Sequence, residues 1–185
     1  MSTPAYRELE NLPSRAIGEL FDGQLHAQSR PSVPHVFSHS LVVGKLSNPF
    51  HSGIGGPGGW VILAEPEVHF ALDVDVTVPD LAGWRRERKL KFPMGHKIEL
   101  VPDWICEILS PSTRSIDREI KMPLYARYGV AHLWLVEPVE HVVEAYRLQD
   151  GDWVKIGCYS GMSQASIPPF EAVPLDLGGL WMPMD

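Results

Sequence analysis

The stretch from Pro102 to Thr113, PDWICEILSPST, decides the fold together with the residues that follow it. Trp104–Leu109 is a continuous apolar segment with one charge, Glu107, which is typical of a strand covered on both faces. The Ser-Pro-Ser-Thr turn predicts the start of a helix, which Gly129 would end as a left-handed cap residue. The β-rich segment His132–Val136 comes next. A strand, a helix and a second strand in this order predict an α/β fold.

Signals for further elements lie on both sides of this stretch. Asp22-Gly23 separates two short alternating segments and predicts a hairpin over residues 18–25. Residues 32–46 predict a helix that Ser32 can cap, and five glycines within residues 53–59 predict a loop. Other β-prone segments predict strands at 60–64, 67–72, 73–81, 141–148 and 153–159.

These elements predict one domain over residues 16–185, with a mixed β-sheet flanked by helices, an N-terminal hairpin and extra C-terminal strands. Residues 1–15 are polar and contain two prolines, which predicts a loosely packed arm. Residues 82–100 predict a charged connection between strands. No internal repeat indicates a second domain.

The composition is that of a soluble globular protein, with 44% hydrophobic and 21% charged residues among 185. No secretory signal and no apolar stretch long enough to cross a membrane is found, so we expect no membrane association. The two cysteines, Cys106 and Cys158, form no C-x-x-C pair, which favours a reducing cytoplasm. The net charge of −7 argues against a protein that coats nucleic acid nonspecifically, although a local basic surface remains compatible with it.

Two carboxylates stand out because of the strands that carry them. Asp80 continues the alternating row of Val74, Val76 and Val78, so it ends a row that faces the core. Glu107 lies inside an apolar strand, where an ionised carboxylate costs several kcal/mol unless a cation or donors compensate it. If the two strand ends converge, the carboxylates raise each other's pKa or bind a cation. Magnesium prefers such oxygen ligands.

Basic residues near these carboxylates have two interpretations each. Lys121 on the predicted helix either forms a surface ion pair with Asp117, four residues earlier, or points toward Glu107. The run that follows Asp80 is either a solvated loop or a surface that contacts phosphates. This run comprises Arg85, Arg86, Arg88, Lys89 and Lys91.

Several of these segments resemble the Uma-two family of endonucleases, which belongs to the PD-(D/E)XK nuclease superfamily. The resemblance covers roughly residues 17–175. Its most specific part is Glu-x-Leu-Ser-Pro-Ser-Thr with a downstream lysine and Tyr-Ala-x-x-Gly-Val. The segments that carry it are Glu19–Gly23, Val78–Asp80, Pro102–Thr113, Asp117, Lys121, Leu124–Ala126, Gly129-Val130 and Trp134–Val136.

The resemblance implies a restriction-endonuclease-like core with Asp80 and Glu107 as ligands of Mg²⁺ or Mn²⁺. It also implies that Lys121 supplies the lysine of the superfamily, because Leu109 occupies the usual position two residues after the glutamate. Pro123 departs from a regular helix just beyond Lys121 and predicts a kink there.

Other polar residues are weaker candidates. Glu19 heads the hairpin and is either an exposed strand residue or a further metal ligand, as N-terminal carboxylates sometimes are in this superfamily. His35 and His39 have a spacing that can bind zinc, but no third ligand follows; His35 also suits a phosphate or substrate contact. Asp73 and Asp75 fall on the opposite strand face from Asp80, so we expect them to meet solvent.

The leading hypothesis is a magnesium-dependent endonuclease that hydrolyses DNA phosphodiester bonds, with Arg85, Arg86, Arg88 and Lys89 as DNA contacts and with a homodimer as a possible assembly. The alternative is a noncatalytic module of the nuclease fold that binds DNA or protein. A hydrolase of another phosphoester is a further alternative, which the acidic net charge keeps open.

Overall fold

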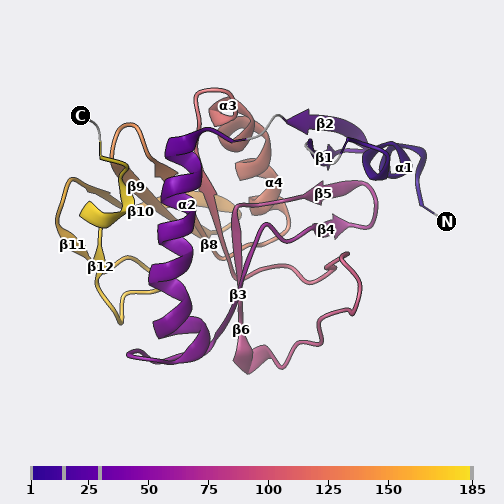
Figure 1. Ribbon diagram of the computed structural model, residues 1–185. Coiled ribbons are helices and arrows are strands. Elements are labelled where there is room, and N and C mark those ends of the chain that lie inside the picture. The colour runs from indigo at the N-terminus through magenta and orange to yellow at the C-terminus, as the bar shows by residue number, and fades with distance from the viewer. Residues whose placement is uncertain (1, 14–15, 29–30, 184–185) are drawn as a thin grey trace.

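The structure is a computed structural model that describes residues 2–13, 16–28 and 31–183. Its main sheet has six strands in the order β10-β9-β8-β7-β6-β3, and a smaller sheet has the order β2-β1-β5-β4 (Figure 1). Within the described part of the main sheet, β7 and β8 pair in parallel and the other neighbours pair antiparallel, so the sheet is mixed, as the sequence predicts. The helices and strands are α1 (Pro4–Glu10), β1 (Ile17–Phe21), β2 (Gln24–Gln28), α2 (Val33–Leu46), η1 (Ser47–Ser52), β3 (Trp60–Ala64), β4 (Val68–Ala71), β5 (Asp75–Thr77), β6 (Leu81–Arg85), η2 (Arg86–Arg88), β7 (Trp104–Ile108), α3 (Arg114–Ile116), η3 (Asp117–Lys121), α4 (Met122–Arg127), β8 (His132–Glu137), β9 (Val142–Gln149), β10 (Asp152–Ser160), β11 (Gln164–Ala165), β12 (Leu175–Asp176) and η4 (Gly178–Leu180).

Helices and the C-terminal segment cover both faces of the main sheet. One core layer places Trp104 of β7 against α2 and against Phe170 of the C-terminal segment. The other layer places Ile105, the next residue of β7, in a cluster with Leu124 of α4. Because successive side chains of a strand point to opposite faces, every residue of β7 is buried. This confirms that the apolar stretch around Glu107 is a central strand.

Residues 2–13 pack against the small sheet, contrary to the expectation of a loosely packed arm over residues 1–15. Thr3 caps α1 by accepting a hydrogen bond from the Tyr6 backbone N–H at 3.2 Å. Tyr6 is fully buried and packs with Leu20 and Val76 on the small sheet. The prediction failed because the partners of Tyr6 lie far along the chain: its hydroxyl donates to Glu67 at 2.6 Å. Residues 14 and 15 lie outside the described residues.

The predicted hairpin and α2 are confirmed, with one difference in detail. Asp22 and Gly23 have φ values of 50° and 76°, which the turn between β1 and β2 requires. Ser32 occupies the N-cap position of α2, but its side chain forms no capping hydrogen bond. The buried residues of α2 are Ser38, Val42 and Leu46, which are spaced four residues apart.

The region between residues 73 and 100 differs most from its prediction. The expected strand 73–81 is reduced to β5, and Asp73 and Asp75 are buried at 5% and 2% exposure instead of meeting solvent. The reason is that cations reach them: Lys97 pairs with Asp73 and Arg127 pairs with Asp75, each at 2.9 Å. The expected connection 82–100 contains most of β6, which pairs with β3 and β7. No helix among the described residues is long and apolar enough to cross a membrane.

Candidate active site

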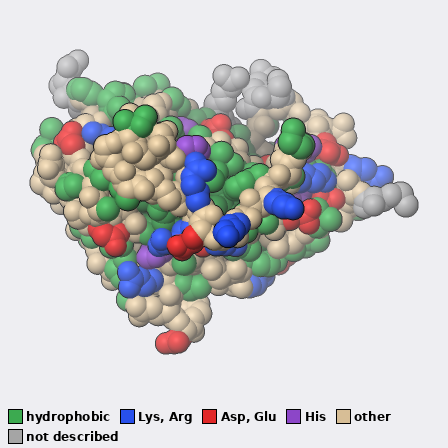
Figure 2. All heavy atoms as spheres, turned by 90° about the horizontal axis from the view of Figure 1, so that it is seen from below, with side chains coloured by type: hydrophobic (Ala, Val, Ile, Leu, Met, Phe, Trp, Pro, Cys, Tyr) green, Lys and Arg blue, Asp and Glu red, His purple; other side chains and the backbone are tan. Residues whose placement is uncertain are grey.

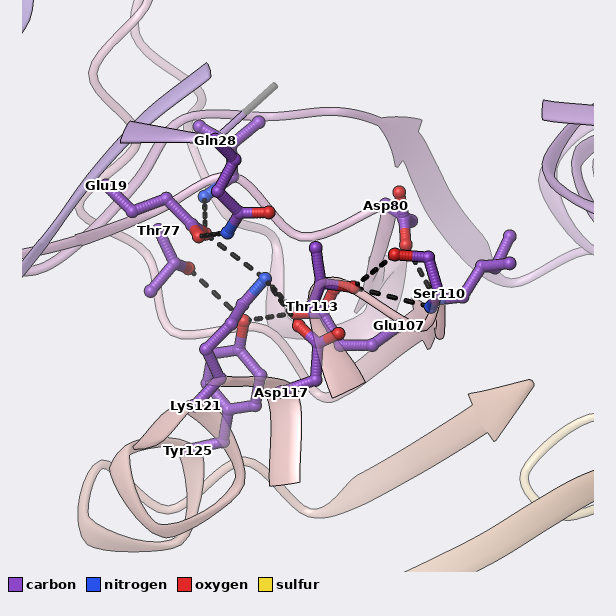
Figure 3. Close-up of polar contacts among 12 residues, drawn as sticks. Glu19, Gln28, Thr77, Asp80, Glu107, Ser110, Thr113, Asp117, Lys121 and Tyr125 are labelled. Atoms are coloured by element: carbon purple, nitrogen blue, oxygen red, sulfur yellow. Dashed lines mark hydrogen bonds and ion pairs between the residues drawn. The ribbon is translucent and has the colours of Figure 1, made fainter. Parts of the chain in front are cut away.

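The candidate site lies where the two sheets meet. Glu19 comes from β1 of the small sheet, and Glu107 comes from the carboxyl end of β7 in the main sheet. Asp80 occupies the short link between β5 and β6, and Lys121 ends the π-helical segment η3. These side chains line one cavity of about 50 Å³, room for a few water molecules or a cation (Figure 3).

Lys121 reaches the carboxylates of the sheet. Its ammonium lies 2.9 Å from Glu107 Oε1, 3.2 Å from Glu19 Oε1 and 3.4 Å from Asp117 Oδ1 (Figure 3). The two sequence interpretations of Lys121 are therefore both realised, although the pair with Asp117 is buried rather than on the surface. Pro123 falls in the first turn of α4, directly after η3. A π-helical segment marks a local change of helical register, and here it precedes the proline without turning Lys121 away.

The charges of this group are not balanced. Three carboxylates contact one ammonium, and each of these four side chains is at most 5% exposed. Burial raises the pKa of the Glu107 carboxyl well above its ordinary value; Lys121 opposes this shift, while the negative charge of Asp117 adds to it. Burial alone would lower the pKa of Lys121, but Glu107 and Glu19 raise it well above its usual value. The site therefore holds excess negative charge that a further cation would offset.

Asp80 is fixed beside Glu107 by backbone and histidine contacts. Its Oδ2 accepts a hydrogen bond from the backbone N–H of Ile108 at 2.6 Å, next to Glu107 in the chain. His35 Nε2 of α2 lies 2.9 Å from Asp80 Oδ1, and His39 Nε2 lies 3.0 Å from the Asp80 carbonyl. Burial disfavours the charge on His35, but the hydrogen bond and charge of Asp80 raise its pKa above the ordinary value. Both histidines thus contact Asp80.

Glu19 belongs to the site, so its interpretation as an exposed strand residue is wrong. It is 1% exposed. Its Oε1 accepts a hydrogen bond from the backbone N–H of Val78 at 2.9 Å, and its Oε2 accepts one from Gln28 Nε2 at 2.7 Å. These contacts hold the Glu19 side chain toward Lys121.

Two further residues were not predicted as members of the site. Tyr125 donates from its hydroxyl to Glu107 Oε1 at 2.5 Å, and Asp117 contacts Lys121. Asp117, Lys121 and Tyr125 are spaced by four residues, which places them on one face of a helix. That spacing is a sequence signal that could have identified both residues once Lys121 was chosen.

The basic run is not brought together with the carboxylates. Asp80 precedes β6 and Arg85 ends it, so the two lie at opposite ends of the strand, roughly 16 Å apart at 3.3 Å per residue. None of the basic residues in this run, from Arg85 to Lys91, lines the cavity that holds Glu107. Arg88 is paired with Asp103 at 2.8 Å, whereas the guanidinium of Arg85 lies over the Trp60 ring, 4.6 Å from its centroid.

Comparisons with known proteins agree with this fold. A crystal structure described as that of a putative nuclease belonging to DUF820, from Anabaena variabilis, matches with a TM-score of 0.73 and 20% identity, covering 96% of each chain. An uncharacterized protein of Synechocystis sp., slr1290, is 28% identical over 138 residues, which is 74% of this chain and 69% of that protein. The sequence model of the Uma2 family, described as "putative restriction endonuclease", matches residues 4–178. The chain therefore belongs to the Uma2 family.

Proposed function

We propose that this protein is a metal-dependent endonuclease that hydrolyses phosphodiester bonds of DNA. The observation that carries the proposal is the charge imbalance around Glu107, which is 2% exposed and shares one lysine with two other carboxylates. Keeping several buried carboxylates around one ammonium is costly for a protein that only needs to fold. Membership of the Uma2 family supports a nuclease over other hydrolases.

The residues of the cavity suit Mg²⁺ or Mn²⁺. Asp80 and Glu107 supply hard oxygen donors, which these ions prefer. Across residues 2–13, 16–28 and 31–183, no three His, Cys, Asp or Glu side chains are grouped to hold a metal ion. A magnesium ion here would consequently be held by one or two carboxylates, with water and substrate phosphate as its other ligands, which is the usual mode for this ion.

The chain's own groups would divide the work of hydrolysis. When bound, a divalent ion lowers the pKa of a coordinated water and neutralises phosphate charge. Asp80 and Glu107 would hold that ion, and the hydrogen bond from Ile108 keeps Asp80 in place. Lys121 would donate to the attacking water or to the phosphate oxygens, where negative charge grows in the transition state. Tyr125 would orient Glu107 through its hydroxyl.

The proposal is tested by cleavage of supercoiled plasmid DNA with Mg²⁺ or Mn²⁺. We expect Asp80→Asn and Glu107→Gln each to abolish cleavage, because a neutral amide binds a divalent ion far more weakly than a carboxylate does. Glu99→Gln, which changes an exposed glutamate outside the cavity, is the matched control and should cleave normally. Thermal unfolding establishes that each variant is folded.

Four results would decide against this function. Full cleavage by Glu107→Gln, or by the wild type in a chelator, would exclude the proposed metal site. DNA binding without cleavage under any metal would favour the noncatalytic module, and hydrolysis of small phosphoesters that DNA does not compete with would favour the other hydrolase. The cytoplasmic location and the homodimer stay predictions.

A further inference from the structure

A second surface of the molecule has the opposite charge to the candidate site. Residues 85–91 contain five basic residues and one acidic residue, a net charge of +4 in a chain whose net charge is −7. They begin at the end of β6 that is remote from Asp80 and continue into η2 and the following loop. Figure 2 views the molecule from this end, and blue Lys and Arg side chains gather there with green apolar side chains between them.

These basic residues border a groove with an apolar floor. The groove has a volume of about 230 Å³, and its apolar floor is formed by the half-buried side chains of Val61, Leu90 and Phe92, with the fully buried Trp84 packed against Phe92. Trp84 and Phe92 meet edge to face with their ring centroids 5.2 Å apart. Arg86 and Lys89 form part of the rim, and both are exposed. A groove of this kind offers an apolar surface with one partly exposed ring, that of Phe92, beside positive charge.

The cations of the rim are available to a ligand. Among the described residues, Arg88 is the member of the run whose charge is neutralised by a contacting carboxylate, that of Asp103. Arg86 donates to the backbone carbonyl of His51 at 3.2 Å, which leaves its charge uncompensated. Lys89 has no ion pair within 4.0 Å in the part of the chain that the structure describes.

The acidic cavity makes such a surface necessary for a polyanionic substrate. Glu19, Glu65, Asp80, Glu107 and Asp117 all line the cavity, against the cation Lys121 and the histidine His35. This cavity repels phosphate until a metal is bound, so the attraction that captures nucleic acid has to come from elsewhere on the surface.

We propose that the groove between β3, β6 and residues 89–92 binds a single-stranded segment of nucleic acid, with a base on the apolar floor and phosphates on the basic rim. Aromatic floors with basic rims bind unpaired bases by stacking, whereas a duplex buries its base faces and an acidic peptide has no flat ring to stack. The binding surface is independent of cleavage. Its role in delivering a strand to the carboxylates, roughly 16 Å away along β6, rests on the proposed function.

The test is binding of a fluorescein-labelled dT20 oligonucleotide to the full chain in EDTA, followed by fluorescence anisotropy between 50 and 200 mM NaCl. Lys89→Glu should weaken binding and lower the slope of log K against log salt by about 0.7, the value for one lost phosphate contact on a single strand. Phe92→Leu keeps an apolar side chain but removes the ring, and it should weaken binding at least about fivefold. Arg7→Glu is the matched control, because it reverses an exposed charge on α1, outside the groove, and should retain both the affinity and the slope.

The outcomes separate this proposal from the proposed function. The proposed groove is rejected if Lys89→Glu and Arg7→Glu weaken dT20 binding equally, or if Phe92→Leu leaves binding unchanged. It is also rejected if a duplex of the same length binds more tightly than dT20, or if polyglutamate competes equally well. Groove-dependent binding of dT20 without DNA cleavage would uphold the groove and reject the nuclease. If Glu107→Gln abolishes metal-dependent cleavage but the groove variants bind dT20 as the wild type does, the nuclease is supported and the groove is rejected.

Discussion

Glu107 and Asp75 are two carboxylates with the same burial, each 2% exposed, but with different surroundings. Asp75 has its own set of donors: the backbone N–H of Asp22 at 2.8 Å on one oxygen, and Arg127 and Tyr128 on the other at 2.9 and 2.5 Å. Glu107 receives the hydroxyl of Tyr125 and an ammonium that it shares with two other carboxylates.

The difference teaches that burial alone does not identify a functional carboxylate. Asp75 ties the hairpin turn to the end of α4, and Arg127, which also contacts Asp22, matches its charge. A buried carboxylate satisfied in this way contributes to structure. Glu107 lies in a cavity where negative charge exceeds positive charge, which is the condition for binding a cation.

The largest expected effect comes from removing the cation of each pair. Lys121→Met leaves Glu19, Glu107 and Asp117 without their common partner, and the metal-free protein should lose about 3–5 kcal/mol of unfolding free energy. Arg127→Met should cost about 1 kcal/mol, because the Arg127 side chain is 50% exposed and Asp75 keeps two other donors. Urea unfolding at pH 7 in EDTA measures both values.

Magnesium sharpens this contrast. Mg²⁺ should restore part of the stability of Lys121→Met, because a divalent ion offsets the same carboxylates, and it should leave the loss in Arg127→Met unchanged. If the unfolding free energy of Lys121→Met does not change on addition of Mg²⁺ or Mn²⁺, the assignment of the cavity as a metal site is contradicted.

The pH dependence of stability should also distinguish Glu107. Its pKa is raised in the folded protein, so the carboxyl contributes stability below its unfolded pKa, and this contribution is lost as pH rises through the folded pKa. Metal-free wild type should therefore lose stability relative to Glu107→Gln as pH rises from about 4.5, by about 1.4 kcal/mol per unit of pKa elevation. Saturating Mg²⁺ should reduce this loss, since it favours the ionised carboxylate. Parallel stability curves for the two proteins between pH 4.5 and 8 would argue against the raised pKa.

The sequence predicted the elements whose signals are local. The apolar run of β7, the Asp22-Gly23 turn and the helical segment that ends at Gly129 each follow from neighbouring residues. Glu107 was identified for the same reason, because one charge in a strand covered on both faces requires compensation wherever its partners lie.

Features that depend on distant partners could not be predicted in this way. Strand alternation alone places Asp73 and Asp75 in solvent, but the cations that accompany them in the structure, Lys97 and Arg127, come from other parts of the chain. The basic run was expected beside Asp80 because the two are close in sequence, but β6 carries the chain to the other end of the sheet between them. The contacts of Lys121 depend on how its helix packs over the sheet, which neighbouring residues do not specify.

The smallest effect, and the closest test of the comparison, comes from two tyrosines at the end of α4. Tyr125→Phe removes a hydroxyl from Glu107, and Tyr128→Phe removes one from Asp75. Because a typical hydrogen bond contributes about 0.5–1.5 kcal/mol net and Asp75 keeps two other donors, Tyr128→Phe should lower the unfolding free energy by less than about 1 kcal/mol and leave cleavage unchanged. Tyr125→Phe should instead slow plasmid cleavage about tenfold and raise the Mg²⁺ concentration required, because Glu107 is no longer held in position. If both variants lose only stability, or if Tyr128→Phe also changes the Mg²⁺ requirement, Glu107 and Asp75 do not differ in function as their surroundings indicate.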